Sequence, residues 1–258
     1  MTIILSDLFA QNNYDNIVTD EKRIDVLLSK VNAAQANADE RTELHNIAIR
    51  VQNNGQELDE KYRQYKKALA TIDKAIVLFT ALGDTLDIAN NRKYKGYLLG
   101  RMEKYKEAKN ETKIAIELYQ LKKMSAGVAV SQFDIARIYE FENKTDSAIY
   151  YASVACNYWK QKDVDLRVLI ANNMLVSLYL KKDQPEKAIE VQHESGMIIN
   201  KPGMHWQAVV DFYYTSMLLY RNTNDDATAN RYKQFYIDKV NSLRGEGIAA
   251  RSYYESDR

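Results

Sequence analysis

YKGYLLGRMEKYKEA, residues 94–108, sets a pattern that the chain repeats as DIARIYEFENKTDSA (134–148) and MLVSLYLKKDQPEKA (174–188). In each window a small residue is followed three positions later by a large one, and nine positions after that by an alanine. A fourth copy reads TSMLLYRNTNDDATA (215–229), and Ala68 with Ala75 forms an earlier half-copy. The shared alanine therefore recurs at positions 68, 108, 148, 188 and 229. Steps of 40 or 41 residues are typical of a helical repeat array.

The spacing within each window fits two stacked helices. Residues three apart share one face of a helix, so the small residue admits a close neighbour while the large one fills the space beside it. A short polar segment then separates the large residue from the alanine, and Pro185 in one such segment suits the first turn of a helix. Each repeat is thus predicted to be helix A, a tight turn and helix B.

With this pattern the chain resembles the tetratricopeptide repeat (TPR) proteins over roughly residues 41–242. The resemblance implies an all-α fold, a right-handed superhelical TPR-like solenoid of antiparallel helix pairs. The repeat is longer than the usual one of about 34 residues. The early tryptophan of helix A is also absent, since its positions hold Arg92, Gln132, Asn172 and Tyr213. These departures make the chain more similar to the long-repeat TPR input domains of bacterial sensor kinases and regulators than to the short-repeat co-chaperones.

Three regions are expected along the chain. Residues 1–18 form a disordered start or the remnant of a signal peptide, and residues 19–242 form the repeat domain, with about five helix pairs and one N-terminal helix. Residues 243–258 form a terminal capping helix or a connector to a signalling helix. Before the regular pairs, one helix is predicted to end at Asn53-Asn54-Gly55 and the next to run from about Leu58 to Leu82.

Composition and residue usage narrow the function classes. A formal net charge of +1 gives no reason to expect direct nucleic-acid binding, and no apolar run is long enough to insert into a membrane. The lone Cys156 rules out an intramolecular disulfide and is predicted to be a buried structural thiol. Because the N-terminal residues fit either a trimmed signal peptide or a cytoplasmic start, the protein is either exported to the periplasm or cytoplasmic.

Catalytic and metal-binding patterns are lacking in the sequence. The three histidines are far apart, and Glu190 with His193 would need a second such pair and further glutamates to build a di-metal site in a helical bundle. One cysteine cannot form a zinc site of the usual kind, and Gly96 and Gly100 belong to a helix rather than a phosphate-binding loop. The chain is therefore predicted to be a non-enzyme with no cofactor and no metal.

The resemblance places a binding surface on the A helices, which line the concave side of a TPR superhelix. Counting from each small residue, the inward positions are three before it and one and four after it. They give the candidate peptide-binding residues Lys93, Tyr97, Phe133, Arg137, Asn173, Ser177, Tyr214 and Arg221. Phe133 and Tyr214 could accept apolar side chains, and Asn173 could hydrogen-bond an extended peptide backbone. Arginines at 137 and 221 could hold a carboxylate with two parallel hydrogen bonds.

Two functions remain open at this point, together with a less favoured third. The first is a scaffold that binds a peptide or protein partner in its concave groove, as a bacterial sensory or regulatory input domain does. The second is a constitutive scaffold for protein assembly, and a homodimer is compatible with either. The third is an enzyme whose site in the helical array the sequence does not reveal. Fold alone cannot choose between them.

Overall fold

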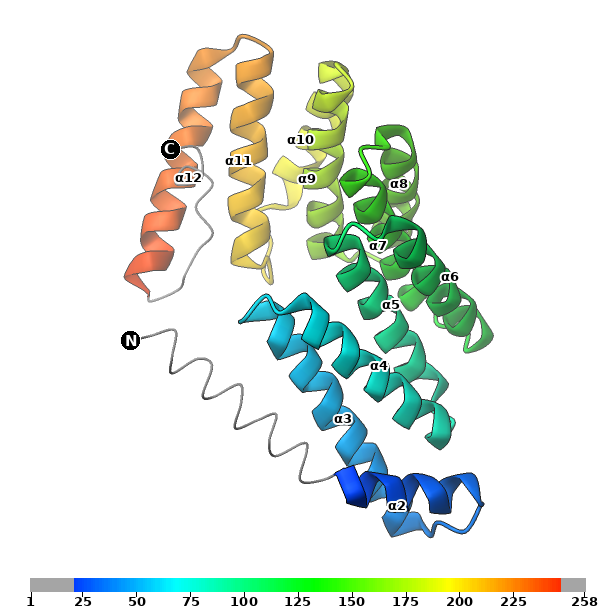
Figure 1. Ribbon diagram of the computed structural model, residues 1–258. Coiled ribbons are helices and arrows are strands. Elements are labelled where there is room, and N and C mark those ends of the chain that lie inside the picture. The colour runs from blue at the N-terminus through cyan, green and yellow to red at the C-terminus, as the bar shows by residue number, and fades with distance from the viewer. Residues whose placement is uncertain (1–20, 247–258) are drawn as a thin grey trace. The chain divides into compact units, whose positions relative to one another are not determined.

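The computed structural model describes residues 21–246, and within that range it is 84% helical, with 11 helices and no strand (Figure 1). The predicted all-α repeat fold is confirmed. The helices are α2 (Glu21–Asn32), α3 (Ala38–Glu60), α4 (Tyr65–Leu82), α5 (Thr85–Arg101), α6 (Tyr105–Leu121), α7 (Ser125–Phe141), α8 (Thr145–Gln161), α9 (Asp165–Lys181), α10 (Pro185–Ile198), α11 (Trp206–Asn222) and α12 (Asp226–Gly245). The predicted N-terminal segment 1–18 and most of the predicted capping or connector helix lie outside the described residues. No helix in the described range is long and apolar enough to cross a bilayer.

The 40-residue period has a simple structural origin. The five helices α5 to α9 each contain 17 residues, and three-residue turns join them at 102–104, 122–124, 142–144 and 162–164. Two such helices and two such turns make one repeat. Relative to the usual TPR unit of about 34 residues, the extra length therefore lies in regular helices joined by tight turns.

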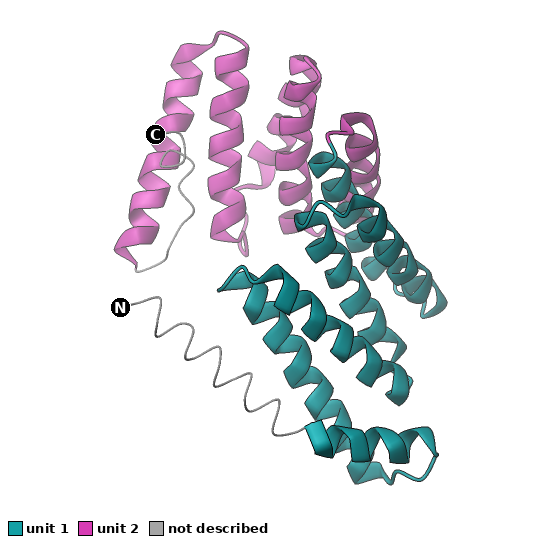
Figure 2. Cartoon of the chain, in the orientation of Figure 1, with its two compact units in different colours: residues 1–142 teal, residues 143–258 magenta. Residues whose placement is uncertain are grey.

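Two compact units divide the chain, Met1–Glu142 and Asn143–Arg258 (Figure 2). In unit 1, α3 pairs with α4 and α5 with α6, while α7 packs on both α5 and α6. In unit 2, α8 packs on α9, and the pairs α9/α10 and α11/α12 follow, with α11 also touching α9. The neighbouring A helices α5 and α7 of unit 1, and α9 and α11 of unit 2, thus meet directly.

The turns between helix A and helix B reuse one backbone conformation. Their central residue is left-handed at Glu103, Asn143, Asp183 and Asn224, with φ between 55° and 61°. Asn and Asp, which hold three of these four positions, tolerate this conformation better than other side chains do. In the turn after α5, the amide of Lys104 donates to the carbonyl of Leu99 at 2.9 Å. The large residue of the sequence pattern therefore also helps to end helix A.

Gly96 shows why helix A needs a small residue. It is buried in α5, and a Cβ atom there would lie 2.2 Å from Oγ1 of Thr112 and 3.0 Å from the carbonyl oxygen of Ala108. Ala108 and Thr112 are both fully buried on α6. The small residue and the shared alanine of the pattern thus form the contact between the paired helices.

Gly55 corrects the predicted boundary of the first pair. The sequence pattern predicted a helix end at this glycine, whereas α3 continues through it to Glu60 and α4 begins only at Tyr65. A Cβ at Gly55 would lie 2.8 Å from Cδ1 of Ile72 on α4 and 3.4 Å from the carbonyl oxygen of Ala68. The glycine permits close packing rather than stopping the helix, so it supplies the small residue that the half-copy at Ala68 seemed to lack. At the other end, α12 runs to Gly245, past the expected boundary at residue 242.

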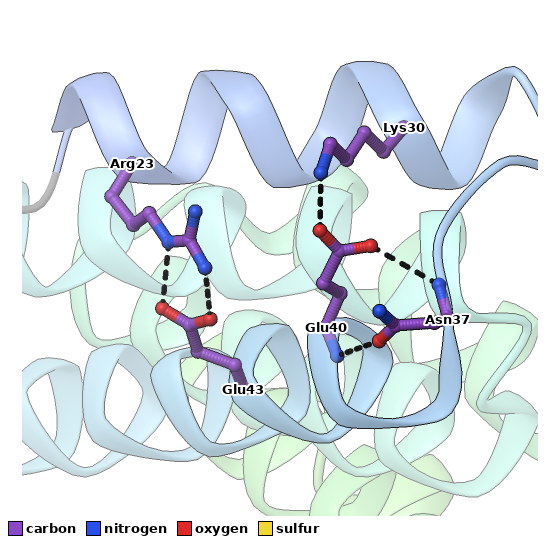
Figure 3. Close-up of polar contacts among 5 residues, drawn as sticks. All are labelled: Arg23, Lys30, Asn37, Glu40 and Glu43. Carbon is purple, nitrogen blue, oxygen red and sulfur yellow. Dashed lines mark hydrogen bonds and ion pairs between the residues drawn. The ribbon is translucent and has the colours of Figure 1, made fainter.

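Polar contacts fix α2 against the start of α3 (Figure 3). Nε of Arg23 donates to Glu43 at 2.8 Å, and Lys30 pairs with Glu40. Glu40 also completes a capping box, because its backbone amide donates to Oδ1 of Asn37 at 2.9 Å and its carboxylate accepts from the amide of Asn37. Beneath these exposed contacts, Leu27 of α2 is buried in a cluster with Leu44 and Phe79, so apolar packing fastens the first helix.

We predict that Gly96→Ala destabilises the protein by about 1–3 kcal/mol, because the added methyl group overpacks the α5–α6 contact. Guanidinium-induced unfolding measures the change. Gly196→Ala is the matched control, since no heavy atom lies within 4 Å of its added Cβ in α10. It should raise stability by about 0.5–1 kcal/mol through helix propensity alone. Equal effects of the two substitutions would refute the close-contact explanation.

Candidate functional site

The predicted binding residues divide between the two units. Lys93 and Tyr97 lie on α5 and Phe133 and Arg137 on α7, all in unit 1. The other four lie in unit 2, where α9 carries Asn173 and Ser177 and α11 carries Tyr214 and Arg221.

Tyr97 and Arg137 are brought together in unit 1. The guanidinium carbon of Arg137 lies 5.0 Å from the centre of the Tyr97 ring, so α7 lays a cation over an aromatic face of α5. Both side chains are half-buried. Stacking on the ring leaves the edges of the guanidinium able to donate hydrogen bonds, and these edges match a carboxylate or a peptide carbonyl.

A buried hydrogen bond supports this pair from the neighbouring turn of α5. The hydroxyl of Tyr94 donates to Oδ2 of Asp59 on α3 at 2.7 Å, and Asp59 is only 6% exposed. Burial, and next the hydrogen bond to the carboxylate, raise the pKa of Tyr94, so it stays a donor at neutral pH. The ring of Tyr94 lies 5.8 Å from that of Tyr97, which fixes the aromatic side of the pair.

Arg101 extends the same surface by one more turn of α5. Its Nη2 donates to the hydroxyl of Tyr65 at 3.0 Å, and its guanidinium carbon lies 5.6 Å from the centre of the Tyr65 ring and 6.0 Å from that of Phe141. We call Tyr94, Tyr97, Arg101 and Arg137 the arginine–tyrosine ladder. It presents two guanidinium groups against aromatic rings across α5 and α7.

Tyr94 and Arg101 are not among the binding residues predicted from the repeat pattern. Tyr94, Tyr97 and Arg101 are spaced i, i+3 and i+7, so extending the helical face of Tyr97 in both directions would have found them. Asp59 carried no such signal, because its partner is 35 residues away and the turn before α4 was misplaced. Of the other predicted residues in this unit, Lys93 is half-buried and Phe133 is 7% exposed, so the Phe133 ring belongs mainly to the core.

In unit 2 the predicted residues serve mostly internal contacts. The Asn173 amide was expected to meet a peptide backbone; it donates at 2.9 Å to the carbonyl of Ala208 on α11, and the residue is 7% exposed. Ser177 donates to the carbonyl of Asn173, one turn earlier in α9. The Tyr214 ring lies 5.9 Å from that of Tyr236 on α12, whereas Arg221 is exposed near the end of α11. Asn173 and Ser177 are therefore used mainly for contacts within the described part of unit 2.

Cys156 is buried, as predicted, at 2% exposure in α8. Its thiol donates to Oδ1 of Asn172 at 3.3 Å, and burial raises its pKa to about 11. A thiol that keeps its proton at neutral pH is a poor nucleophile.

Metal-ligand atoms converge at one place that the sequence analysis did not single out. His45 on α3 and the two aspartates Asp84 and Asp87 at the start of α5 each offer a ligand atom, and these atoms lie within 4.8 Å of one another. Both carboxylates already accept hydrogen bonds, Asp84 from the amide of Asp87 and Asp87 from the side chain of Asn90. Asp84 is the N-cap of α5, and Asp87 lies in its first turn, where the helix dipole favours a carboxylate. Since their positions at the start of the helix account for both aspartates, we assign no metal to this cluster.

No protein-family model and no curated protein matches the sequence. Solved structures do match. BtubC (BKLC) from P. vanneervenii gives a TM-score of 0.68 at 14% identity, covering 89% of this chain and 92% of its own. A signal-transduction ATPase with numerous domains (STAND) from Pyrococcus horikoshii, which carries a tetratricopeptide repeat sensor, gives 0.67 at 13% identity, covering 95% of this chain and 37% of its own. The apo form of RapI gives 0.57 at 12% identity, with 92% and 80% covered.

Together the fold and these structures define the class: the chain is a TPR-like helical repeat protein. The resemblance seen in the repeated windows is thereby confirmed. At 12–14% identity the structures share the fold with this chain, and they assign no ligand to it.

We predict that Tyr94→Phe lowers stability by about 1–3 kcal/mol at neutral pH, because the buried carboxylate of Asp59 loses the only hydrogen bond to its side chain within residues 21–246. Chemical denaturation measures the loss. Tyr97→Phe serves as the control, since the Tyr97 hydroxyl has no hydrogen-bond partner in the same range, and its effect should stay within about 0.5 kcal/mol. A Tyr94→Phe variant as stable as wild type would mean that water satisfies Asp59.

Cys156 should resist thiol reagents at pH 8 in the folded protein and react promptly once guanidinium unfolds the chain. Mass spectrometry of iodoacetamide-treated samples follows the reaction. Because folding raises the thiol pKa from 9.0 to about 11, the stabilisation that it contributes is complete below pH 9.0 and is lost as the pH rises toward about 11. Rapid labelling of the folded protein would contradict the buried position.

Proposed function

We propose that the protein is a non-catalytic scaffold that binds a peptide or protein partner on the A helices of unit 1. The observation that carries the proposal is the Arg137 guanidinium stacked over Tyr97, with Arg101 held in a similar way on Tyr65. Stacking holds each arginine in place before a partner arrives, so less conformational entropy is lost on binding. The partner best suited to such a surface presents carboxylates or backbone carbonyls beside apolar side chains.

The remaining predicted residues take secondary roles in this proposal. Lys93 lies one turn from Tyr97 on α5 and adds positive charge to the same helix. In unit 2, Tyr214 and Arg221 place one aromatic and one cationic side chain on α11. Asn173 and Phe133 support the A helices through internal contacts. The Asn173 amide donates to the carbonyl of Ala208, and the Phe133 ring is buried.

A sensory or regulatory role is the favoured biological setting. It is supported by the fold shared with a STAND protein that carries a TPR sensor and with RapI. A ligand acts on such an array only by binding one arrangement of the helices better than another. The alternative, a constitutive assembly scaffold, would keep its partner permanently and would expose a large apolar surface without it. Light scattering of the purified protein separates the two, because a sensor stays monodisperse alone and the permanent scaffold aggregates.

The direct test compares Arg137→Gln with Arg167→Gln in the full chain. Arg167 is a matched control, since it is an exposed arginine lying 6.0 Å from the centre of the Trp159 ring in unit 2. A partner captured by the wild type from a lysate of the source organism is identified, purified and titrated against each variant. We expect about tenfold weaker binding for Arg137→Gln and little change for Arg167→Gln. Equal affinities for both variants would place the binding surface elsewhere.

A further inference from the structure

Unit 1 also contains a separate cationic groove. It is lined mainly by α6, holds about 840 Å³, and is bordered by Lys95, Lys106, Lys109, Asn110, Lys113 and Tyr139. Four lysines thus surround one cavity. None of its lining residues belongs to the arginine–tyrosine ladder, so the groove is a different feature of the unit.

Charge in this part of the chain is strongly uneven. Residues 61–123 hold 15 Lys and Arg against seven Asp and Glu, although the whole chain holds 36 against 35. The net charge of +1, which gave no reason to expect direct nucleic-acid binding, therefore averages a basic segment with an acidic remainder. A local cationic surface attracts anions whatever the total charge of the molecule is.

Internal ion pairs occupy only part of the lysine set. Nζ of Lys95 lies 2.7 Å from Asp73 and 3.1 Å from Glu111, and Nζ of Lys109 lies 2.6 Å from Glu142. Lys106 and Lys113 are exposed, and among the described residues neither forms an ion pair or hydrogen bond through its side chain. Two ammonium groups are therefore available to a ligand in the groove.

The two glutamates that line the groove do not cancel the positive charge of its four lysines. Glu111 is shared by Lys95 and Arg92, at 3.1 Å and 2.7 Å. Glu107 is exposed, and its one ion pair, with Lys104, is long at 3.9 Å. It is the one carboxylate of the groove that opposes an incoming anion.

The positions of the two lysines set the spacing of a ligand. Lys106 and Lys113 are seven residues apart, two helical turns, or about 10.5 Å along the axis of α6. A peptide in the polyproline II conformation advances about 9.3 Å in three residues, which is one full turn, so side chains three apart share one face. Carboxylates at positions i and i+3 of such a segment therefore match the spacing of the two ammonium groups, and the Tyr139 ring also lines the groove.

We propose that this groove binds an acidic peptide segment with two carboxylates three residues apart, through Lys106 and Lys113. The site is independent of the ladder, so a partner can engage either surface or both. Occupying both would raise the overall affinity through effective concentration without any new contact.

The test titrates the full chain with a short fluorescent peptide that carries two glutamates separated by two neutral residues. Fluorescence anisotropy reports binding at low salt. Lys106→Gln/Lys113→Gln should weaken it by about tenfold. The matched control, Lys66→Gln/Lys67→Gln, removes two exposed charges from α4 outside the groove and should change the affinity by less than about twofold. Glu107→Gln should strengthen binding, since it removes the opposing charge.

Three results would overturn the proposal. The first is that the peptide does not bind to the wild type. The second is that the two double variants weaken binding equally, which would mean that only the overall positive charge of the basic segment attracts the peptide. The third is equal affinity for a peptide with adjacent glutamates, which would reject the i, i+3 spacing. Arg137→Gln should leave this titration unchanged, so failure here is distinguishable from failure of the ladder as a binding surface.

Discussion

The close approach of helix A to helix B at a small residue is the constraint on which the rest of this structure depends. At Gly96 the two backbones come so near that a single methyl group would collide with Thr112 and Ala108, and Gly55 repeats the arrangement one pair earlier. Side chains at this contact must be small. The large side chains lie three residues further along, where Leu99 packs against Ala108. Tight turns with one left-handed residue then return the chain for the next contact. Across α5 to α9, the 40-residue period follows from repeating this contact with helices of 17 residues.

Committing one face of each helix to the stack leaves other faces for binding. On α5 the stacked face carries Gly96 and Leu99, and a neighbouring face carries the tyrosines and arginine of the ladder. On α6 the buried alanines face α5, whereas Lys106 and Lys113 point to solvent. The same helix pair therefore supports two chemically different surfaces, one built from stacked guanidinium groups and the other from ammonium groups beside a groove. The cationic groups of both surfaces are paired with carboxylates, lie over aromatic rings or are exposed.

The sequence predicted the repeat and the helix pairs because small residues, alanines and polar turns recur at fixed spacing, and all three signals are local. It misplaced the end of α3, because a glycine before polar residues is also the mark of a helix stop and only the packing of Ile72 shows otherwise. The ladder was found in part: Tyr97 and Arg137 followed from counting, whereas the residues that support it, Asp59 and Tyr65, depend on contacts across helices. Asn173 was wrongly expected to bind a peptide backbone. Its side-chain amide instead donates to the carbonyl of Ala208 in the same chain, a contact that the sequence pattern does not reveal. The net charge of the whole chain likewise gave no sign of the basic segment at residues 61–123.

The most direct test of the central claim is native-state hydrogen exchange, resolved to individual helices, on the intact protein. If the small-residue contacts organise each unit, the slowest-exchanging amides of unit 1 lie in the middle of α5 and α6, around Gly96 and Thr112. Exchange should be faster in α2, which joins the stack at one end only, and at the helix ends. Exchange in the centres of α5 and α6 as fast as that in α2 would contradict the account.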